Sequence, residues 1–149
     1  MHKVRAKSTF KRAIMLEADG KTDGNRRVRG AGGIVRWRFV LDNQETRGSR
    51  FDSAFIHYGP PPRKLGKIHG VASPFLEDRR LPHPPKMTLK RAVKLLRKAG
   101  FNNGFFNVTL RKPLTQQEHT HPLYIFAVAK GGQSFVAVDT KTSKVAPLQ

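Results

Sequence analysis

Short apolar runs separated by brief loops constrain the fold of this chain more than any other feature. The clearest run lies at residues 35–41, where apolar residues at odd positions alternate with Arg36 and Arg38. This period of two is typical of a half-buried strand with one basic face. Further strands are predicted at residues 51–58, 65–72, 105–110, 123–129 and 135–138. The loops within each group of three strands are too short for parallel crossovers, so we expect an antiparallel sheet.

Two segments have the apolar spacing of a helix. Residues 8–18 place apolar side chains at helical intervals, and residues 88–99 do the same behind Thr88, a predicted N-cap. Gly20 and Gly100 are expected to end these two helices. The sequence therefore predicts an α+β fold, an antiparallel sheet with two helices.

The order of these elements is helix, three strands, connector, helix, three strands. It suggests a duplicated αβββ layout with halves at residues 8–72 and 88–146, joined by a Pro-rich connector at 73–86. A length of 149 residues is within the usual size of one domain, so residues 1–149 are predicted to form a single domain.

The second half ends in Val138-Asp139-Thr140, a polar turn, and Lys144-Val145. Together with the preceding helix, these residues resemble PepSY-like and cystatin-like α+β domains over residues 88–146, with Ser143 where those domains usually have Gly. The resemblance implies a helix packed on an antiparallel sheet. It also implies an exported protein that restrains peptidases or serves as an interaction module.

Charge is the most unusual property of the composition. Lys and Arg number 29 against 10 Asp and Glu, which gives a formal net charge of +19. Such a charge attracts polyanions over roughly 8 Å at physiological salt, so we predict an acidic partner: nucleic acid, an acidic protein surface or an acidic polysaccharide. The predicted polyanion-binding residues come from three basic segments without interleaved carboxylates: Arg26, Arg27, Arg29, Arg36, Arg38, Lys90, Arg91, Lys94, Arg97 and Lys98.

No catalytic, metal or cofactor site is predicted. The chain has no cysteine, which excludes disulfides, thiol catalysis and thiolate metal ligands. It has no Gly-x-Ser-x-Gly elbow, and the glycines at 30–33 precede a strand rather than a helix, unlike a nucleotide-binding loop. An enzymatic function is therefore not expected.

The histidines offer the nearest approach to a metal site. His119 and His121 are two residues apart and would share one face of a strand. A third ligand would have to be His57, His69 or His83. Because the surrounding segment is polar, we interpret His119 and His121 as solvated loop residues.

The function predicted from these features is that of a non-enzymatic basic binding module for an acidic macromolecule, with nucleic acid contacted through its phosphates as the favoured partner. The alternatives are an exported PepSY-like interaction or inhibitor protein and a structural subunit that self-associates through its sheet edges. No membrane span is expected, because no run of about 18 apolar residues exists. No signal peptide is recognised, so a cytoplasmic protein and an exported one with a removed leader are both open.

Overall fold

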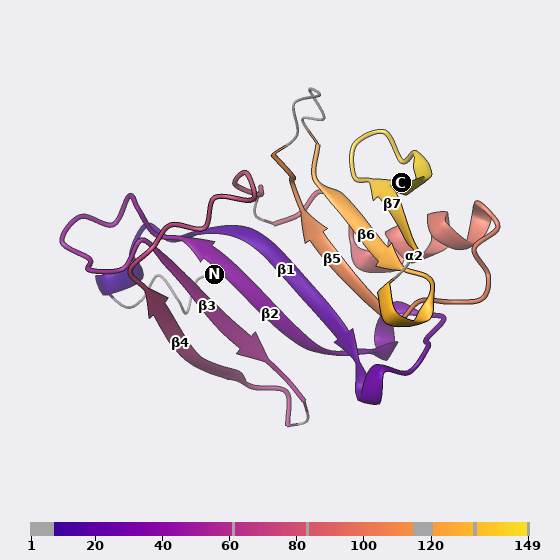
Figure 1. Cartoon of the computed structure of the whole chain (residues 1–149), viewed down its shortest axis with the longest axis horizontal. Coiled ribbons are helices and arrows are strands. Elements are labelled where there is room, and N and C mark those ends of the chain that lie inside the picture. The colour runs from indigo at the N-terminus through magenta and orange to yellow at the C-terminus, as the bar shows by residue number, and fades with distance from the viewer. Residues whose placement is uncertain (1–7, 61, 83, 115–120, 133, 149) are drawn as a thin grey trace.

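Eight antiparallel strands form one curved sheet in the computed structural model, in the order β4-β3-β2-β1-β5-β6-β7-β8 (Figure 1). The structure describes residues 8–60, 62–82, 84–114, 121–132 and 134–148. The first four strands are β1 (Ile14–Thr22), β2 (Ile34–Asp42), β3 (Ser53–Tyr58) and β4 (Leu65–Val71). The second four are β5 (Asn107–Arg111), β6 (Leu123–Ala127), β7 (Phe135–Asp139) and β8 (Val145–Leu148).

The two groups of strands meet in the middle of the sheet, where β1 pairs with β5. This pairing runs from Glu17 opposite Arg111 to Lys21 opposite Asn107. Within each group, every strand pairs with the next one along the chain, as short loops require. The β1–β5 ladder therefore joins strands that are far apart in the sequence.

The helix predicted at residues 88–99 is confirmed as α2 (Leu89–Lys98). The Thr88 side chain accepts a hydrogen bond from the backbone N–H of Arg91, which caps the first turn. At the other end, Gly100 has φ +99° and the N–H of Phe101 donates to the carbonyl of Leu96, so the helix cannot continue.

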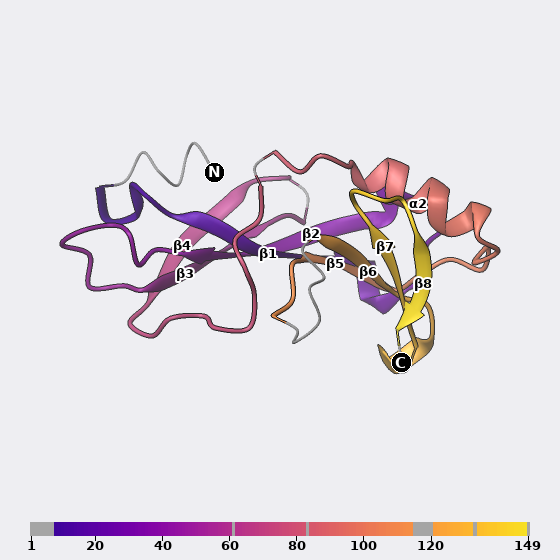
Figure 2. The same ribbon diagram turned by 90° about the horizontal axis from the view of Figure 1, so that it is seen from above.

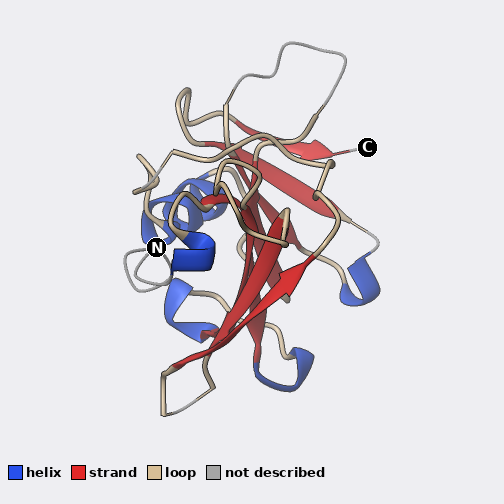
Figure 3. Cartoon of the chain, turned by 90° about the vertical axis from the view of Figure 1, so that its left-hand side faces the viewer, coloured by secondary structure: helices blue, strands red, loops and turns tan. Residues whose placement is uncertain are grey.

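The helix lies on one face of the sheet, over β5–β8 (Figures 2 and 3). Its apolar stripe of Ala92, Val93 and Leu96 is buried in the main core. We call this side of the sheet the helix face and the opposite side the polar face. The remaining helical segments are single turns of 3-10 helix: η1 (Ser8–Phe10), η2 (Asp23–Asn25), η3 (Ala31–Gly33) and η4 (Lys130–Gly132).

Strand alternation decides which face each side chain joins. In β2 the odd positions Trp37, Phe39 and Leu41 face the helix side, and the even positions Arg36 and Arg38 face the polar side. The predicted basic strand face therefore exists, on the side of the sheet away from α2.

The connector crosses from one face of the sheet to the other on its way from β4 to α2 (Figure 2). It does so where the start of β1 diverges from the end of β5. The N–H of Arg79 donates to the carbonyl of Lys112, and the N–H of Leu81 donates to the carbonyl of Met15. These bonds satisfy the carbonyl of Met15 in β1 and that of Lys112 just after β5, at a point where the two strands do not pair with each other.

The predicted α+β fold with two helices is wrong. Residues 8–18, the first predicted helix, form η1 and the beginning of β1 instead. The reason is that β1 is central and buried on both faces, so its apolar residues do not alternate. Met15 and Ala18 face the helix side, and Glu17 is buried on the polar side. The apolar residues therefore recur at intervals that resemble those of a helix.

The duplicated αβββ layout is also contradicted. Each group contributes four strands rather than three: β1 stands in the first group where a helix was predicted, and Val145–Leu148 forms β8 against β7 in the second. Among the described residues α2 is the one α-helix, and it covers only the second group. None of the described helices is long and apolar enough to cross a lipid bilayer.

Candidate polyanion-binding surface

The exposed side of α2 carries five cations and no carboxylate. Lys90, Arg91, Lys94, Arg97 and Lys98 are all exposed. Every ion pair found within the described residues uses a cation outside α2. The helix therefore presents positive charge that its own surroundings leave uncompensated.

These cations do not stabilise the helix as a group. Arg97 and Lys98 lie in the last turn, where positive charge is favoured by the helix dipole, but Lys90 and Arg91 lie in the first turn, where it is disfavoured. Like charges three or four residues apart, such as Lys90 and Lys94, repel by a few tenths of a kcal/mol, roughly 0.2–0.5. Repulsion among these cations destabilises the helix in the free protein, and a bound anion would relieve that repulsion.

The Arg26–Arg29 loop lies beside the turn that follows α2. Val28 exchanges two backbone hydrogen bonds with Phe105, at 2.9 and 2.8 Å. Gly104 has φ +90°, and a Cβ there would lie 2.3 Å from the carbonyl oxygen of Val28, so glycine is required for this close approach. The guanidinium of Arg27 stands 4.9 Å from the centre of the Phe106 ring.

Arg27 also borders a hollow of 190 Å³ together with the residues at 100–104 that follow the helix. Arg26, Arg27 and Arg29 are exposed. The structure thus places the basic loop beside the turn that follows the basic helix.

The third segment is not part of this surface. Arg36 and Arg38 project from the polar face, where they border a hollow of 430 Å³ with Asp19, Lys21 and His57. The Arg36 guanidinium is 3.7 Å from the Asp23 carboxylate, and both side chains are largely exposed. Such a pair contributes little, so Arg36 keeps an accessible charge.

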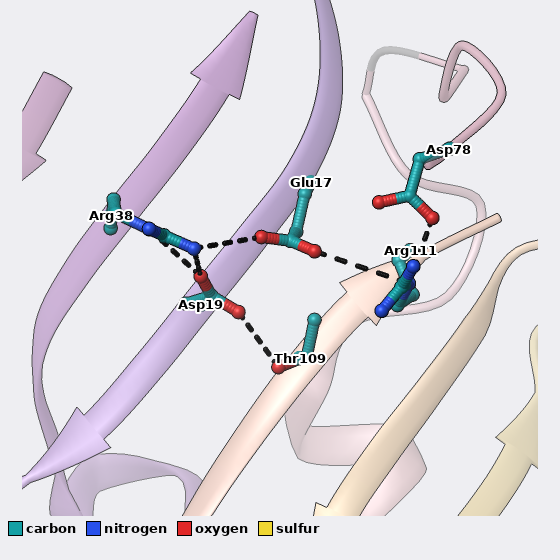
Figure 4. A network of polar contacts seen from close by, with 6 residues as sticks. All are labelled: Glu17, Asp19, Arg38, Asp78, Thr109 and Arg111. Atoms are coloured by element: carbon teal, nitrogen blue, oxygen red, sulfur yellow. Dashed lines mark hydrogen bonds and ion pairs between the residues drawn. The ribbon is translucent and has the colours of Figure 1, made fainter. Parts of the chain in front are cut away.

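Arg38 is different, because two carboxylates engage it (Figure 4). Its Nε and Nη2 lie 2.9 and 2.5 Å from Oδ2 of Asp19, and Nη2 is also 3.0 Å from Oε1 of Glu17. Arg38 was predicted to contact phosphate. The carboxylates of Asp19 and Glu17 would compete with a phosphate for its guanidinium group. Two guanidinium nitrogens thus donate to one carboxylate oxygen, and hydrogen bonds between charged groups are stronger than those between neutral groups.

The same network continues into β5 and the connector. Thr109 donates to Oδ1 of Asp19 at 2.8 Å, and Arg111 donates from Nε to Oδ1 of Asp78 at 2.7 Å. The Arg111 Nε is also 3.9 Å from Oε2 of Glu17. Three carboxylates thus share two guanidinium groups at the junction of β1, β2, β5 and the connector (Figure 4).

Burial changes the protonation of this cluster. Loss of hydration first, and then the neighbouring charge of Asp19, raise the pKa of Glu17 to about 7. Burial also raises the pKa of Asp78, whose Oδ2 has no hydrogen-bond partner among the described residues. Only the spacing of Glu17 and Asp19 on one strand face hints at the cluster in the sequence; the partners come from distant segments.

The histidines do not form a metal site in the part of the chain that the structure describes, where no three His, Asp or Glu side chains are placed to hold a metal ion. His121 lies with its Nδ1 3.0 Å from Oδ2 of Asp139. His119 and His83 lie outside the described residues.

The fold and surface together define a broad class: a basic protein built on one antiparallel sheet with a single described helix. No family model and no curated protein matches the sequence. The fold is similar to the crystal structure of a "putative lipoprotein" from Clostridium difficile 630, with a TM-score of 0.57 and 14% identity. That similarity covers 96% of this chain and 88% of the other. It concerns the fold alone, and the resemblance to PepSY-like and cystatin-like domains stays a prediction.

Proposed function

We propose that this protein is a non-enzymatic binding module for an acidic macromolecule, with nucleic acid contacted through its phosphates as the favoured partner. One observation carries the proposal: five exposed cations on α2 have no carboxylate partner among the described residues and lie beside a second basic segment, the Arg26–Arg29 loop.

A nucleic acid suits this surface in shape as well as in charge. The helix has ten residues and is therefore about 15 Å long. Duplex DNA carries one negative charge per roughly 1.7 Å of axis, so several phosphates can meet the helix at once. Contacts of this type position a protein on the backbone without reading the base sequence.

The contact residues that support the proposal differ from those predicted from the sequence. The α2 cations and the Arg26–Arg29 loop are retained. Arg38 is left out because Asp19 and Glu17 engage it, and Arg36 because it lies on the opposite face of the sheet.

The test is the salt dependence of binding to duplex DNA, measured by fluorescence anisotropy. Each phosphate contact contributes about −0.9 to the slope of log K against log salt. Changing four α2 cations should therefore make the slope shallower by about 3.6 if each contributes one contact. The variant carries Lys90→Gln, Arg91→Gln, Lys94→Gln and Lys98→Gln.

A matched control carries the same loss of charge elsewhere, from +19 to 19 − 4 = +15. It changes four exposed lysines outside α2: Lys67, Lys130, Lys141 and Lys144 to Gln. The control should keep most of the slope. Equal losses in the two variants would show that net charge, and not α2, determines binding, and an unchanged α2 variant would contradict the proposal. Heparin measured in parallel identifies a preference for acidic polysaccharide.

The open sheet edges favour a second candidate, a structural subunit that assembles by strand addition. In β4 the side chains of Leu65 and Val71 are 39% and 38% exposed. The other edge, β8, contains Pro147, which lacks a backbone N–H and so weakens pairing there. Assembly would therefore use β4, and sedimentation equilibrium over a range of protein concentrations tests for it.

A further inference from the structure

A pocket of about 540 Å³ lies where the connector meets the ends of β5 and β7 and the start of β6. We call it the connector pocket. Its walls come from segments that are far apart in the sequence: the connector, the strand ends of β5 and β6, and the turn after β7. The described lining includes none of the five α2 cations and no residue of the Arg26–Arg29 loop. The pocket is therefore separate from the surface proposed to bind nucleic acid.

The charge of this lining has one sign. Its titratable side chains are all basic: Arg80, Lys86, Lys112, His121 and Lys141. No Asp or Glu is found among the described lining residues. The charge of Arg80 is compensated, because its Nε donates to Oδ2 of Asp42 at 2.8 Å and its Nη1 donates to Glu45. The three lysines form no ion pair within the described residues, so their charge is not compensated there.

Hydrogen bonds hold the walls that carry these lysines. The N–H of Arg79 donates to the carbonyl of Lys112 at 2.8 Å, which joins the connector to the end of β5. The buried hydroxyl of Tyr124 donates to the carbonyl of Met87 at 2.9 Å, directly after Lys86. The backbone at two of the three lysines is therefore fixed against the sheet.

The turn after β7 is fixed in the same way. The hydroxyl and the N–H of Thr140 both donate to the carbonyl of Pro122, at 2.8 and 3.1 Å. The carboxylate of Asp139 accepts the N–H of Lys141 at 2.8 Å and lies 3.0 Å from Nδ1 of His121. Asp139 thus holds the turn and the histidine in place. An anion in this pocket would meet charges whose backbone needs little further ordering.

The type of cation favours a phosphate monoester over a carboxylate. Arginine binds carboxylates through its planar fork, and the fork of Arg80 is already engaged by Asp42 and Glu45. Lysine acts as a point charge and is a common ligand of phosphate. A phosphate monoester carries about −1.5 to −2 at pH 7, so it neutralises more of the lysine charge than a carboxylate does.

The size and the remaining walls of the pocket indicate an organic body on the ligand. Apart from Thr140, the other lining residues are apolar: Leu81, Pro82, Pro85, Leu110 and Pro122. A volume of about 540 Å³ is within the roughly 300–1,000 Å³ of small-ligand sites. A bare phosphate ion would fill only a small part of this volume and would leave the apolar wall in contact with water.

We propose that the connector pocket binds a small organic phosphate monoester, with its phosphate at Lys86, Lys112 and Lys141 and its apolar body against the leucines and prolines. This activity goes beyond the proposed binding of nucleic acid, because both the residues and the class of ligand are different.

Phenyl phosphate, titrated by isothermal calorimetry at pH 8 and low salt, tests the class of ligand. Its binding should be saturable. Phenyl sulfate has the same ring and a single negative charge, and it should bind about tenfold more weakly because it meets the same lysines with less charge. Inorganic phosphate lacks the ring and should also bind about tenfold more weakly, since the apolar burial is lost.

Two matched double variants locate the site. Lys86→Gln with Lys141→Gln removes two charges from the lining and should weaken phenyl phosphate binding about tenfold. Lys130→Gln with Lys144→Gln removes the same charge outside the lining and should change the affinity by less than about twofold. All four lysines are exposed, so both variants should keep the fold, which thermal unfolding checks.

Three results would overturn the inference: no saturable binding of phenyl phosphate, equal affinity for phenyl sulfate or inorganic phosphate, or equal effects of the two double variants. Displacement of phenyl phosphate by duplex DNA without terminal phosphates would assign the pocket to the nucleic-acid surface and would also reject it. The α2 variant with four Gln substitutions should bind phenyl phosphate as the wild type does. Failure of this inference is thereby distinguished from failure of the nucleic-acid proposal, which is measured with DNA alone.

Discussion

Glu17 shows how one buried side chain can link the fold to pH. It lies between the guanidinium groups of Arg38 and Arg111, near the carboxylates of Asp19 and Asp78. With three acids against two arginines, full ionisation would leave an excess negative charge in a region shielded from water. Burial, and after it the negative charge of Asp19, disfavour the ionised form of Glu17, and this is why its pKa is raised.

This protonation predicts that stability falls as pH rises. Folded Glu17 has a pKa of about 7, whereas the unfolded group has one near 4.5. Its contribution to the free energy of unfolding is complete below pH 4.5 and declines as pH rises through 7. The loss is up to about 3 kcal/mol. Glu17→Gln cannot ionise, so its stability relative to the wild type, measured by urea unfolding, should rise between pH 5 and pH 8 by most of that amount.

A suitable control for this prediction is Asp23→Asn, which changes an exposed acid of η2 outside the Glu17 cluster. It should follow the wild-type pH dependence between pH 5 and pH 8. A constant difference between Glu17→Gln and wild type over the same range would show that Glu17 is ionised in the folded protein.

At the scale of one element, the buried and the exposed side of α2 should contribute differently to the free energy of unfolding. Leu96 is fully buried, and Lys94 is exposed two residues earlier. Leu96→Ala should lower the free energy of unfolding by about 2–5 kcal/mol, because it removes buried apolar surface and leaves a cavity. Lys94→Gln should change it by less than about 0.5 kcal/mol, since only surface repulsion is altered. Urea denaturation of both variants tests this, and similar losses would contradict the packing of α2.

At the scale of the whole molecule, the two groups of strands should unfold together. They share the β1–β5 ladder, the hydrogen bond from Thr109 to Asp19 and one buried core. Fluorescence of Trp37 reports on the first group, and far-ultraviolet circular dichroism reports on both. The two signals should give the same denaturation midpoint. Separate midpoints would show that the ladder does not couple the halves.

Charge is also distributed unequally over the molecule. The acids on the strands lie on the polar face, and most engage arginines there, as Asp19 does with Arg38 and Asp42 does with Arg80. The helix side has cations without such partners on α2. The five cations of α2 therefore lie on the helix face without the carboxylate partners that the arginines of the polar face have.

The sequence by itself determined the elements whose pattern is local. Residues 35–41 alternate because β2 has one apolar and one polar face, and the stripe behind Thr88 is apolar because α2 packs on a single face. Net charge, on which the proposal of an acidic partner rests, is likewise a property of composition. None of these requires knowledge of distant contacts.

Only the tertiary structure decided the rest. Residues 14–18 form a strand because β2, β5 and the connector surround them, and burial on both faces erases the alternation that marks a strand. Arg38 is engaged because β1 places Glu17 and Asp19 opposite it. In each case the structure depends on contacts with residues that are distant in the sequence, so the local sequence pattern does not predict it.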